Sequence, residues 1–449
     1  MNVKKRVRYA PSPTGFLHIG NARTALFNYL FASHYEGVFI IRIEDTDLCR
    51  NIENSEQNQL RQLKWLGINW SEGPDCGGPF GPYRQSERLN IYSKYAQILL
   101  DKKMAYKEYK QNDCKKYVIR FRVSSNQDKK YEFNDLVRGC LSFQSKEIED
   151  WILIKENGFP TYNFAAAIDD HLMGITHILR GEEHITNTPK QIMIYNAFNW
   201  SVPIFGHISL ILNKNGKKLS KRDENSTLHF IQKYIDMGFL PNALFNFLSL
   251  LGFYPSASKE ILEPKELIEL FDVKKLIKSP AVFDDKKLFF INNQYIKKIP
   301  ILELVEIIKP FFVKENIFLD QEFLQKLTFC FQDRISYLEE IVKLYNVFFI
   351  KKLKLNDQQV EFIKKNVKLD VLKTLYDYIY NLKFWNEDIM NKLISFFQEK
   401  SGLKGKDLFL TLRIICTYRN EGPHLINYLN LLGKSKILNN IEKFFIYLN

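Results

Sequence analysis

The chain has 449 residues, of which 45% are hydrophobic and 26% charged, and its formal net charge is +13. The length is too great for one ordinary hydrophobic core, so we expect two or more domains. The composition is typical of a soluble globular protein. The basic excess favours a polyanionic partner without proving one, and the absence of any run of 18 apolar residues excludes a transmembrane helix.

The cysteines and the N-terminus both indicate a reducing compartment. No two cysteines form a CxC or CxxC pair, which leaves a zinc site little support and makes reduced thiols the default. The basic segment ahead of residue 8 has no apolar stretch of the kind a secretory signal needs. We therefore expect a cytoplasmic protein. The cysteines are Cys49, Cys76, Cys114, Cys140, Cys330 and Cys416.

The N-terminal residues predict a βαβ unit. Residues 7–10 have the character of a short buried strand, and residues 21–35 carry apolar side chains at helical spacing. Residues 37–43 form a largely apolar run, as inside a parallel sheet. The polar residues 44–47 follow at once, where open α/β sheets bind ligands.

The loop over residues 8–21, RYAPSPTGFLHIGN, joins the first predicted strand to the first predicted helix. Its prolines and glycines are sufficient for an ordinary turn. Alternatively, its backbone N–H groups and His18 form a cradle for nucleotide phosphates at the helix N-terminus. The loop by itself does not decide between the two interpretations.

The middle of the chain predicts a sheet that is interrupted and then resumed. Helices are expected at 55–66 and 86–101, with a glycine- and proline-rich excursion at 72–82 between them. Residues 103–158 predict an inserted α+β module. After it we expect strands at 159–169, 174–180 and 204–212 and a helix at 189–198.

From residue 228 onward the pattern is mostly helical, so we expect an α-helical C-terminal domain. Residues 301–449 hold 22 Lys and Arg against 18 Asp and Glu, so this part contributes only +4 of the net charge. Helices are expected at 301–313, 321–331, 335–350, 369–382, 387–398, 407–417 and 424–432.

Two short motifs, far apart in the chain, carry the chemistry. His18-Ile-Gly-Asn21 follows the first predicted strand, and Lys218-Leu-Ser-Lys-Arg222 follows the last. Each alone is unremarkable, because a basic pentamer is usually a solvated loop. Together and in this order they resemble the two ATP-binding elements of class I aminoacyl-tRNA synthetases.

Further motifs make the resemblance more specific. They are Ala10-Pro-Ser-Pro-Thr-Gly15, Arg42-Ile-Glu-Asp-Thr-Asp47, Gly81-Pro-Tyr-Arg-Gln-Ser-Glu87 and Arg180-Gly-Glu-Glu-His184. With these motifs the chain resembles, over essentially its whole length, the bacterial type of glutamyl-tRNA synthetase.

The resemblance implies an α/β fold: a Rossmann-type parallel-sheet catalytic domain, split by an α+β insertion and followed by an all-α anticodon-binding domain. It implies ATP-dependent activation of L-glutamate to glutamyl-adenylate, which requires tRNA, and transfer of glutamate to the 3′ end of tRNA(Glu). The expected parts are the two catalytic halves 1–102 and 159–227, the acceptor-stem module 103–158, a connecting helical domain 228–300 and the anticodon domain 301–449.

The resemblance also implies the site residues. His18, Lys218 and Lys221 would be catalytic, and the lysines would stabilise the departing pyrophosphate. The expected ATP contacts are Pro13, Thr14, Gly15, His18, Gly20, Asn21, Lys218, Leu219, Ser220, Lys221 and Arg222. The expected glutamate contacts are Arg8, Ala10, Ser12, Glu44, Tyr162, Arg180 and His184.

Several of these assignments have an alternative. Arg180 by itself could form a surface ion pair with Glu182 or Glu183, and His184 could be a satisfied polar residue. Arg334 is the expected anticodon contact, whereas for Arg413 packing or an ion pair is favoured over contact with the anticodon.

The partners implied are tRNA(Glu), with tRNA(Gln) left open, and L-glutamate, with no membrane and a monomeric chain. Mg²⁺ would arrive with ATP. Some family members have a zinc knuckle built on a Cys-x-Cys pair in the insertion. That pair is absent here, so we expect no zinc.

Three other functions remain open. A glutaminyl-tRNA synthetase would have a β-rich anticodon region, unlike residues 301–449. A truncated relative that glutamylates a modified tRNA base would lack those residues. A non-catalytic RNA-binding paralogue would not be expected to keep His18, Lys218, Lys221, Arg8 and Arg180.

Overall fold

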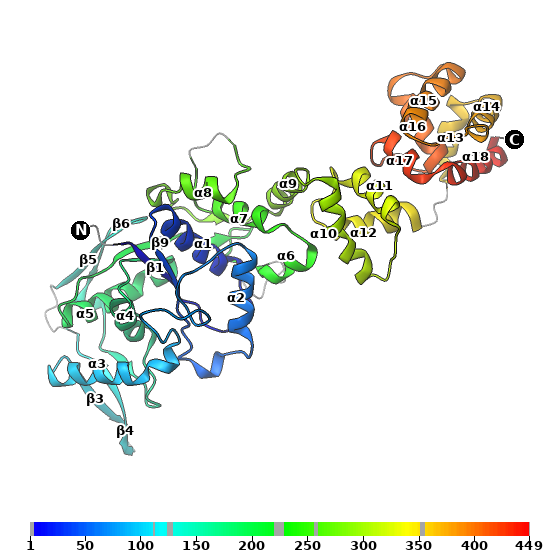
Figure 1. Cartoon of the computed structure of the whole chain (residues 1–449). Coiled ribbons are helices and arrows are strands. Elements are labelled where there is room, and N and C mark those ends of the chain that lie inside the picture. The colour runs from blue at the N-terminus through cyan, green and yellow to red at the C-terminus, as the bar shows by residue number, and fades with distance from the viewer. Residues whose placement is uncertain are drawn as a thin grey trace. The chain divides into compact units, whose positions relative to one another are not determined.

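The computed structural model describes residues 4–110, 113–123, 129–219, 229–255, 259–350 and 355–448. The chain divides into two compact units, Met1–Ile291 and Asn292–Asn449. Figure 1 shows strands and helices mixed in the first unit and helices throughout the second. Each unit is described by itself below.

The first unit is built on parallel strands. β1 (Arg6–Tyr9) pairs in parallel with β2 (Val38–Ile41), and β8 (His177–Gly181) pairs in parallel with β9 (Ile204–Ile208). The two pairs are joined where Thr176 N donates to the carbonyl of Arg6. The strand interiors are buried, as their apolar runs predict for a parallel sheet.

Helices pack against these strands, as predicted for an α/β catalytic domain. α1 shares its buried face with β1, β2 and β8. These helices are α1 (Ile19–His34), α2 (Ser55–Trp65), α3 (Leu89–Asp101), α4 (Tyr162–Leu172) and α5 (Thr188–Ala197).

The prediction of a strand over 159–169 is wrong, because α4 occupies most of that segment. Residues 164–170 are all buried, and such a run has no polar face from which helical period could be recognised. Three consecutive alanines, Ala165–Ala167, favour a helix here. The predicted strand 204–212 is also interrupted after Ile208 and resumes as β10 (Ile211–Leu212).

The inserted region consists mainly of strands. A three-stranded antiparallel sheet has the order β3-β4-β7, and β5 and β6 form a separate hairpin. In the described part of this region the only helical element is a 3₁₀ turn, Ser145–Glu147. The core side chains of the sheet belong to the same buried cluster as those of α3, α4 and α5. The strands are β3 (Ala105–Lys110), β4 (Asp113–Phe121), β5 (Lys130–Asp135), β6 (Gly139–Gln144) and β7 (Trp151–Ile154).

The rest of the first unit packs beside α1. β10 pairs in parallel with β11 (Ala281–Val282), and α7 and α8 contact α1. The boundary between the two units falls within α9. The helices are α6 (Ile231–Met237), α7 (Pro241–Leu250), α8 (Pro264–Leu270) and α9 (Asp285–Ile296).

The second unit is helical in its described residues, as predicted. The expected helix 335–350 is shorter, because α12 gives way to a π-helical turn, Asn346–Ile350. The sequence pattern missed α13 and α18. The helices are α10 (Ile301–Lys314), α11 (Gln321–Phe331), α12 (Glu340–Tyr345), α13 (Asp357–Asn366), α14 (Leu369–Tyr380), α15 (Glu387–Ser401), α16 (Gly405–Thr417), α17 (Leu425–Leu432) and α18 (Lys434–Leu448).

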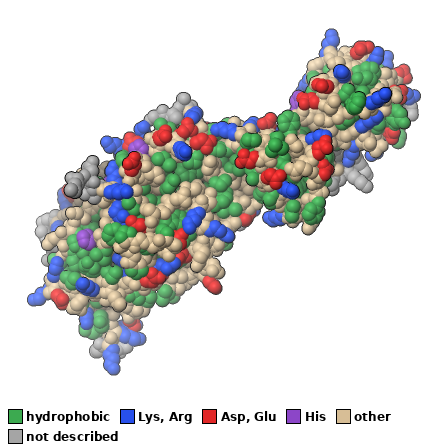
Figure 2. All heavy atoms as spheres, viewed as in Figure 1, with side chains coloured by type: hydrophobic (Ala, Val, Ile, Leu, Met, Phe, Trp, Pro, Cys, Tyr) green, Lys and Arg blue, Asp and Glu red, His purple; other side chains and the backbone are tan. Residues whose placement is uncertain are grey.

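The surface carries both signs of charge. In Figure 2, Lys and Arg side chains are spread over the visible face of each unit and are interspersed with Asp and Glu. No helix in the described ranges is long and apolar enough to cross a membrane.

Candidate active site

The loop between β1 and α1 is held in place at its middle and at its C-terminal end. His18 is the N-cap of α1, and its Nδ1 accepts the N–H of Gly20 at 3.2 Å, which satisfies one of the free donors of the first turn. Gly15 adopts a φ of 128°, which favours glycine. Its N–H donates to Ser55 Oγ at 2.9 Å, and Ser55 Oγ donates to its carbonyl at 2.7 Å. The loop is therefore anchored on α2.

A cavity of about 400 Å³ opens beside this loop at the carboxyl ends of β1, β2 and β8. All seven residues expected to contact glutamate line it. The lining includes Arg8, Ala10, Ser12, Glu44, Tyr162, Arg180 and His184.

Arg180 is buried and has neutral acceptors around it. Its Nε donates to His207 Nε2 at 3.1 Å, and Nη1 donates to Gln191 Oε1 at 2.8 Å and to the Tyr162 hydroxyl at 3.4 Å. Its Nη2 donates to Thr188 Oγ1 at 2.7 Å and to the carbonyl of His184 at 3.4 Å. Burial lowers the pKa of Arg180, which therefore holds its charge at an energetic cost. The alternative of a surface ion pair with Glu182 or Glu183 is wrong, because Arg180 is only 4% exposed and Glu182 pairs with Arg138.

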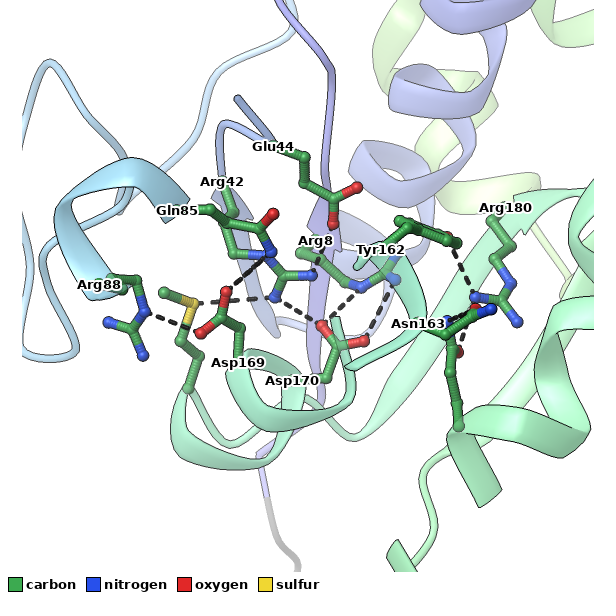
Figure 3. A network of polar contacts seen from close by, with 12 residues as sticks. Arg8, Arg42, Glu44, Gln85, Arg88, Tyr162, Asn163, Asp169, Asp170 and Arg180 are labelled. Carbon is green, nitrogen blue, oxygen red and sulfur yellow. Dashed lines mark hydrogen bonds and ion pairs between the residues drawn. The ribbon is translucent and has the colours of Figure 1, made fainter. Parts of the chain in front are cut away.

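Arg8, in contrast, lies in a network of ion pairs (Figure 3). Its Nε and Nη2 donate to the two oxygens of Asp170 at 2.9 and 3.2 Å. Arg42 donates to the same carboxylate at 2.6 Å and to Glu44 Oε1 at 3.1 Å. Burial opposes ionisation of Asp170, but the charges of Arg42 and Arg8 outweigh it and lower its pKa. Burial raises the pKa of Glu44, although Arg42 and Arg8 oppose the shift.

His184 lies at the same end of the cavity as Tyr162, with ring centroids 5.2 Å apart. Burial, and then the charge of Arg180, lower the pKa of His184 to about 4. His184 is therefore neutral at physiological pH.

A second cavity, of about 250 Å³, lies next to the first. His18, Gly20 and Asn21 line it together with Lys218 and Leu219, so the two distant motifs meet here. Both cavities share the four lining residues Asn21, Thr24, Gly181 and Glu183.

The described residues among the remaining expected ATP contacts do not line the second cavity. Thr14 lines the first cavity, and Pro13 and Gly15 line neither of the two. Ser220, Lys221 and Arg222 lie outside the described residues. Their roles stay predictions.

The sequence analysis missed the polar residues behind the expected contacts. Asp169 accepts from Gln85, Arg88 and Tyr92, and Asp170 joins Arg8 to Arg42. An available signal was the pair of adjacent aspartates at the end of an apolar run, because buried carboxylates need partners. Thr188, Gln191 and His207, which hold Arg180, gave no comparable signal.

Comparison with known proteins agrees with this arrangement. Residues 4–115 and 109–290 match the family of class I tRNA synthetases (E and Q), catalytic domain, and residues 303–445 match an anticodon binding domain. The chain is 49% identical to a glutamate–tRNA ligase of Acholeplasma laidlawii, over 98% of this chain and 97% of that protein. It is 45% identical to the glutamate–tRNA ligase of Bacillus subtilis, over 98% and 100%.

A solved structure agrees along the whole chain. The crystal structure of a glutamate tRNA ligase from Elizabethkingia meningosepticum, in complex with its amino acid, superposes with a TM-score of 0.89 at 31% identity and covers 100% of both chains. The chain therefore belongs to the glutamate–tRNA ligases, a family of class I aminoacyl-tRNA synthetases.

Proposed function

We propose that this protein is a glutamate–tRNA ligase that activates L-glutamate with ATP and transfers it to the 3′ end of tRNA(Glu). The observation that carries the proposal is the cavity of about 400 Å³ that brings together Arg8, Glu44 and Arg180 beside the cavity lined by His18 and Lys218. We place the activity in the cytoplasm and in a monomer, as the sequence analysis expects.

The first cavity has the groups that glutamate requires. Glutamate carries two carboxylates and one ammonium, and a guanidinium binds a carboxylate through two parallel hydrogen bonds. Arg180 supplies a buried positive charge whose contacts are all neutral acceptors, and Glu44 supplies an acceptor for the ammonium. Glutamine would leave the charge of Arg180 without an anion, so the site would discriminate against it.

The second cavity suits the phosphates of ATP. In the first step a glutamate carboxylate oxygen attacks the α-phosphorus, the bond to the oxygen bridging the α- and β-phosphorus breaks, and pyrophosphate leaves. Such a displacement needs positioned groups and positive charge more than a protein nucleophile. His18 at the start of α1 and Lys218 provide these, and Lys221 is expected to act with them.

The second step, the transfer of glutamate to tRNA, takes place in the same cavity. A ribose hydroxyl at the tRNA 3′ end attacks the carbonyl of the adenylate, and AMP leaves. Among the described residues, no three His, Cys, Asp or Glu side chains are grouped to hold a metal ion. We propose that Mg²⁺ enters the reaction bound to the phosphates of ATP, as this ion commonly does.

The second unit supports a tRNA partner. The chain has 16 arginines, and the three that follow residue 223 all lie in this unit. Arg413 Nη2 donates to the carbonyl of Pro423 at 2.8 Å, while its Nη1 and the Nε of Arg419 are buried and find no hydrogen-bond partner within the described part of the chain. Burial, and then the charge of Arg334, lower the pKa of Arg413.

Among the described residues no carboxylate pairs with these three arginines. Arginines left without anions in a unit of low net charge fit contacts to RNA, and Arg334 remains the proposed anticodon contact. Whether tRNA(Gln) is also accepted depends on how this unit reads the anticodon.

The test is aminoacylation of purified tRNA(Glu) and tRNA(Gln) with labelled glutamate. Charging of tRNA(Glu) is expected, and charging of neither would reject the proposal. Pyrophosphate exchange, run with and without tRNA, then tests whether activation requires tRNA. Replacing Arg334 with Gln should lower kcat/KM for tRNA about tenfold, the usual cost of one lost contact of this kind, without changing KM for glutamate.

A further inference from the structure

A buried carboxylate–imidazole pair lies directly behind Arg180. Asp135 is the last residue of β5 in the inserted region, and His207 lies in β9 of the catalytic sheet. The two side chains are fully buried, and His207 Nδ1 lies 2.6 Å from Asp135 Oδ2. The hairpin continues onto the sheet, since Leu136 N donates to the carbonyl of Phe205 at 2.9 Å.

The strand register places this pair beside the glutamate cavity. Arg180 on β8 is the register partner of His207 on β9, and Arg180 Nε donates to His207 Nε2 at 3.1 Å. A guanidinium N–H can only donate, so Nε2 must be the unprotonated nitrogen of the ring. The ring proton is therefore on Nδ1 and is donated to Asp135.

The hydrogen-bond donors around Asp135 require its side chain to be an ionised carboxylate. Its Oδ1 accepts the backbone N–H groups of Val137, Arg138 and His207 at 2.9, 2.8 and 3.1 Å. Both oxygens must accept, so an ionised carboxylate fits the position and an amide in either orientation does not. Burial opposes ionisation of Asp135, but its hydrogen bonds, that from His207 first, lower its pKa.

We propose that His207 and Asp135 are positioning residues for glutamate: they fix the orientation of the Arg180 guanidinium, and the inserted region thereby supplies a part of the amino-acid site. Anchoring Nε to His207 sets the plane in which the two Nη groups meet the substrate. Without that acceptor, a buried Nε–H would lose its partner and the guanidinium would rotate to recover one. The inference rests on the proposed function of Arg180 as a ligand of a glutamate carboxylate.

Two near-isosteric variants of His207 separate orientation from packing. The amide of His207→Gln reaches the position of Nε2 and can still accept from Arg180, whereas the amide of His207→Asn reaches only the position of Nδ1. His207→Asn should raise KM for glutamate roughly ten- to a hundredfold, the range seen when an orienting partner of a metal ligand is lost. His207→Gln should stay within about threefold of the wild type, and KM for ATP should change in neither variant.

Asp135→Asn is the complementary test. The new amide nitrogen donates either toward His207 Nδ1 or toward the three backbone N–H groups. In the first case Nδ1 must accept, so the ring proton moves to Nε2, where it faces the N–H of Arg180 Nε. KM for glutamate should therefore rise as in His207→Asn. His171→Asn is the control, because this ring stacks on Trp200 at 3.6 Å and does not line the cavity.

The outcomes distinguish this inference from the proposed function. If replacing Arg180 raises KM for glutamate but His207→Asn and His207→Gln behave alike, the positioning role is rejected and the proposed function stands. If replacing Arg180 has no effect on KM for glutamate, the proposed site itself is rejected. Nitrogen NMR of the histidine rings in the intact protein gives a test that does not depend on variants: His207 should carry its proton on Nδ1, and a proton on Nε2 would overturn the inference.

Discussion

The two walls of the glutamate cavity hold their arginines in different ways. On one wall, here called the ionic wall, Arg8 and Arg42 contact the carboxylates of Asp170 and Glu44. On the other, the neutral wall, Arg180 contacts only uncharged groups: His207, Gln191, Thr188, Tyr162 and the carbonyl of His184. Figure 3 shows the ionic wall and, beside it, Arg180 with Tyr162, one of its uncharged contacts.

The two walls use buried charge for different purposes. On the ionic wall the charges stabilise the protein, and on the neutral wall the charge attracts the substrate. On the ionic wall the carboxylates of Glu44 and Asp170 neutralise Arg8 and Arg42, and Asp169, 3.8 Å from Arg42, is paired with Arg88 behind them, so this wall is complete before substrate arrives. On the neutral wall the desolvation cost of Arg180 is offset by hydrogen bonds to uncharged groups and by the Phe205 ring, 5.2 Å from the guanidinium carbon, and a bound carboxylate would add an opposite charge in direct contact. We therefore expect the preference for glutamate to depend more on Arg180 than on Arg8.

The largest effect should come from removing the charge on the neutral wall. Arg180→Met keeps an unbranched apolar stem but removes the guanidinium, so a glutamate carboxylate is left without its partner. We expect kcat/KM for glutamate to fall on the order of 10³-fold or more, as when a polar partner built for one substrate group is lost. Pyrophosphate exchange measures this.

The midpoint of thermal unfolding is the companion measurement for Arg180→Met. It should change little, because the lost hydrogen bonds are offset by removal of an unpaired buried charge. A large loss of stability with normal glutamate kinetics would contradict the comparison of the two walls.

On the ionic wall the corresponding change should affect folding first. Asp170→Asn leaves Arg8 and Arg42 facing a neutral amide in a fully buried position. We expect the free energy of unfolding to fall by about 3–5 kcal/mol, the usual cost of breaking a buried ion pair from one side. Urea denaturation measures it.

Asp47→Asn is the matched control for Asp170→Asn. Asp47 pairs with Arg50, but the side chains are 46% and 72% exposed. A pair of this kind contributes about 1 kcal/mol or less. Equal losses in the two variants would show that the ionic wall has no special part in stability.

The sequence predicted the residues that line the cavity better than the residues that hold them in position. Arg8, Glu44 and Arg180 stand in motifs, because groups that meet the substrate occupy fixed places at or just after the carboxyl ends of strands. Asp170 and His207 lie within buried runs, and which strand or helix face brings them to an arginine depends on register and packing. The same lack of a polar face made α4 resemble a strand. Residues that act through contacts with distant parts of the chain are not recognisable from the residue types next to them in the sequence.

A third variant should convert the neutral wall into an ionic one. Gln191→Glu places a carboxylate where Gln191 Oε1 now lies, 2.8 Å from Arg180 Nη1. The new ion pair would neutralise Arg180 before substrate binds, so KM for glutamate should rise roughly ten- to a hundredfold, a loss of about 1.4–2.7 kcal/mol of binding. The control is Gln191→Met, which removes the acceptor without adding charge and should raise KM less. An unchanged KM in Gln191→Glu would mean that the charge on Arg180 does not attract the substrate.

The smallest effect concerns the pH dependence of stability at the neutral wall. Burial and Arg180 keep the pKa of His184 near 4, below the ordinary value of 6.5. Between these two values the unfolded chain binds a proton that the folded chain excludes, so this contribution to stability is full above pH 6.5 and is lost as the pH falls toward 4. The slope from one such group is at most about 1.4 kcal/mol per pH unit.

The contribution of His184 to the pH dependence of stability is obtained by comparing a His184 variant with the wild type. His184→Gln should flatten the fall in unfolding free energy between pH 6.5 and 5.5, a range chosen to lie above the ordinary pKa values of carboxylates. Because the charge of Arg180 is one cause of the shift, Arg180→Met should raise the pKa of His184 toward its ordinary value and flatten the same slope in part. The charge of Arg8 still opposes the imidazolium in that variant, so the rise is partial, and NMR titration of His184 in Arg180→Met measures it. A His184 pKa that stays near 4 in that variant would assign the shift to burial and to charges other than Arg180, and would remove the electrostatic argument for the neutral wall.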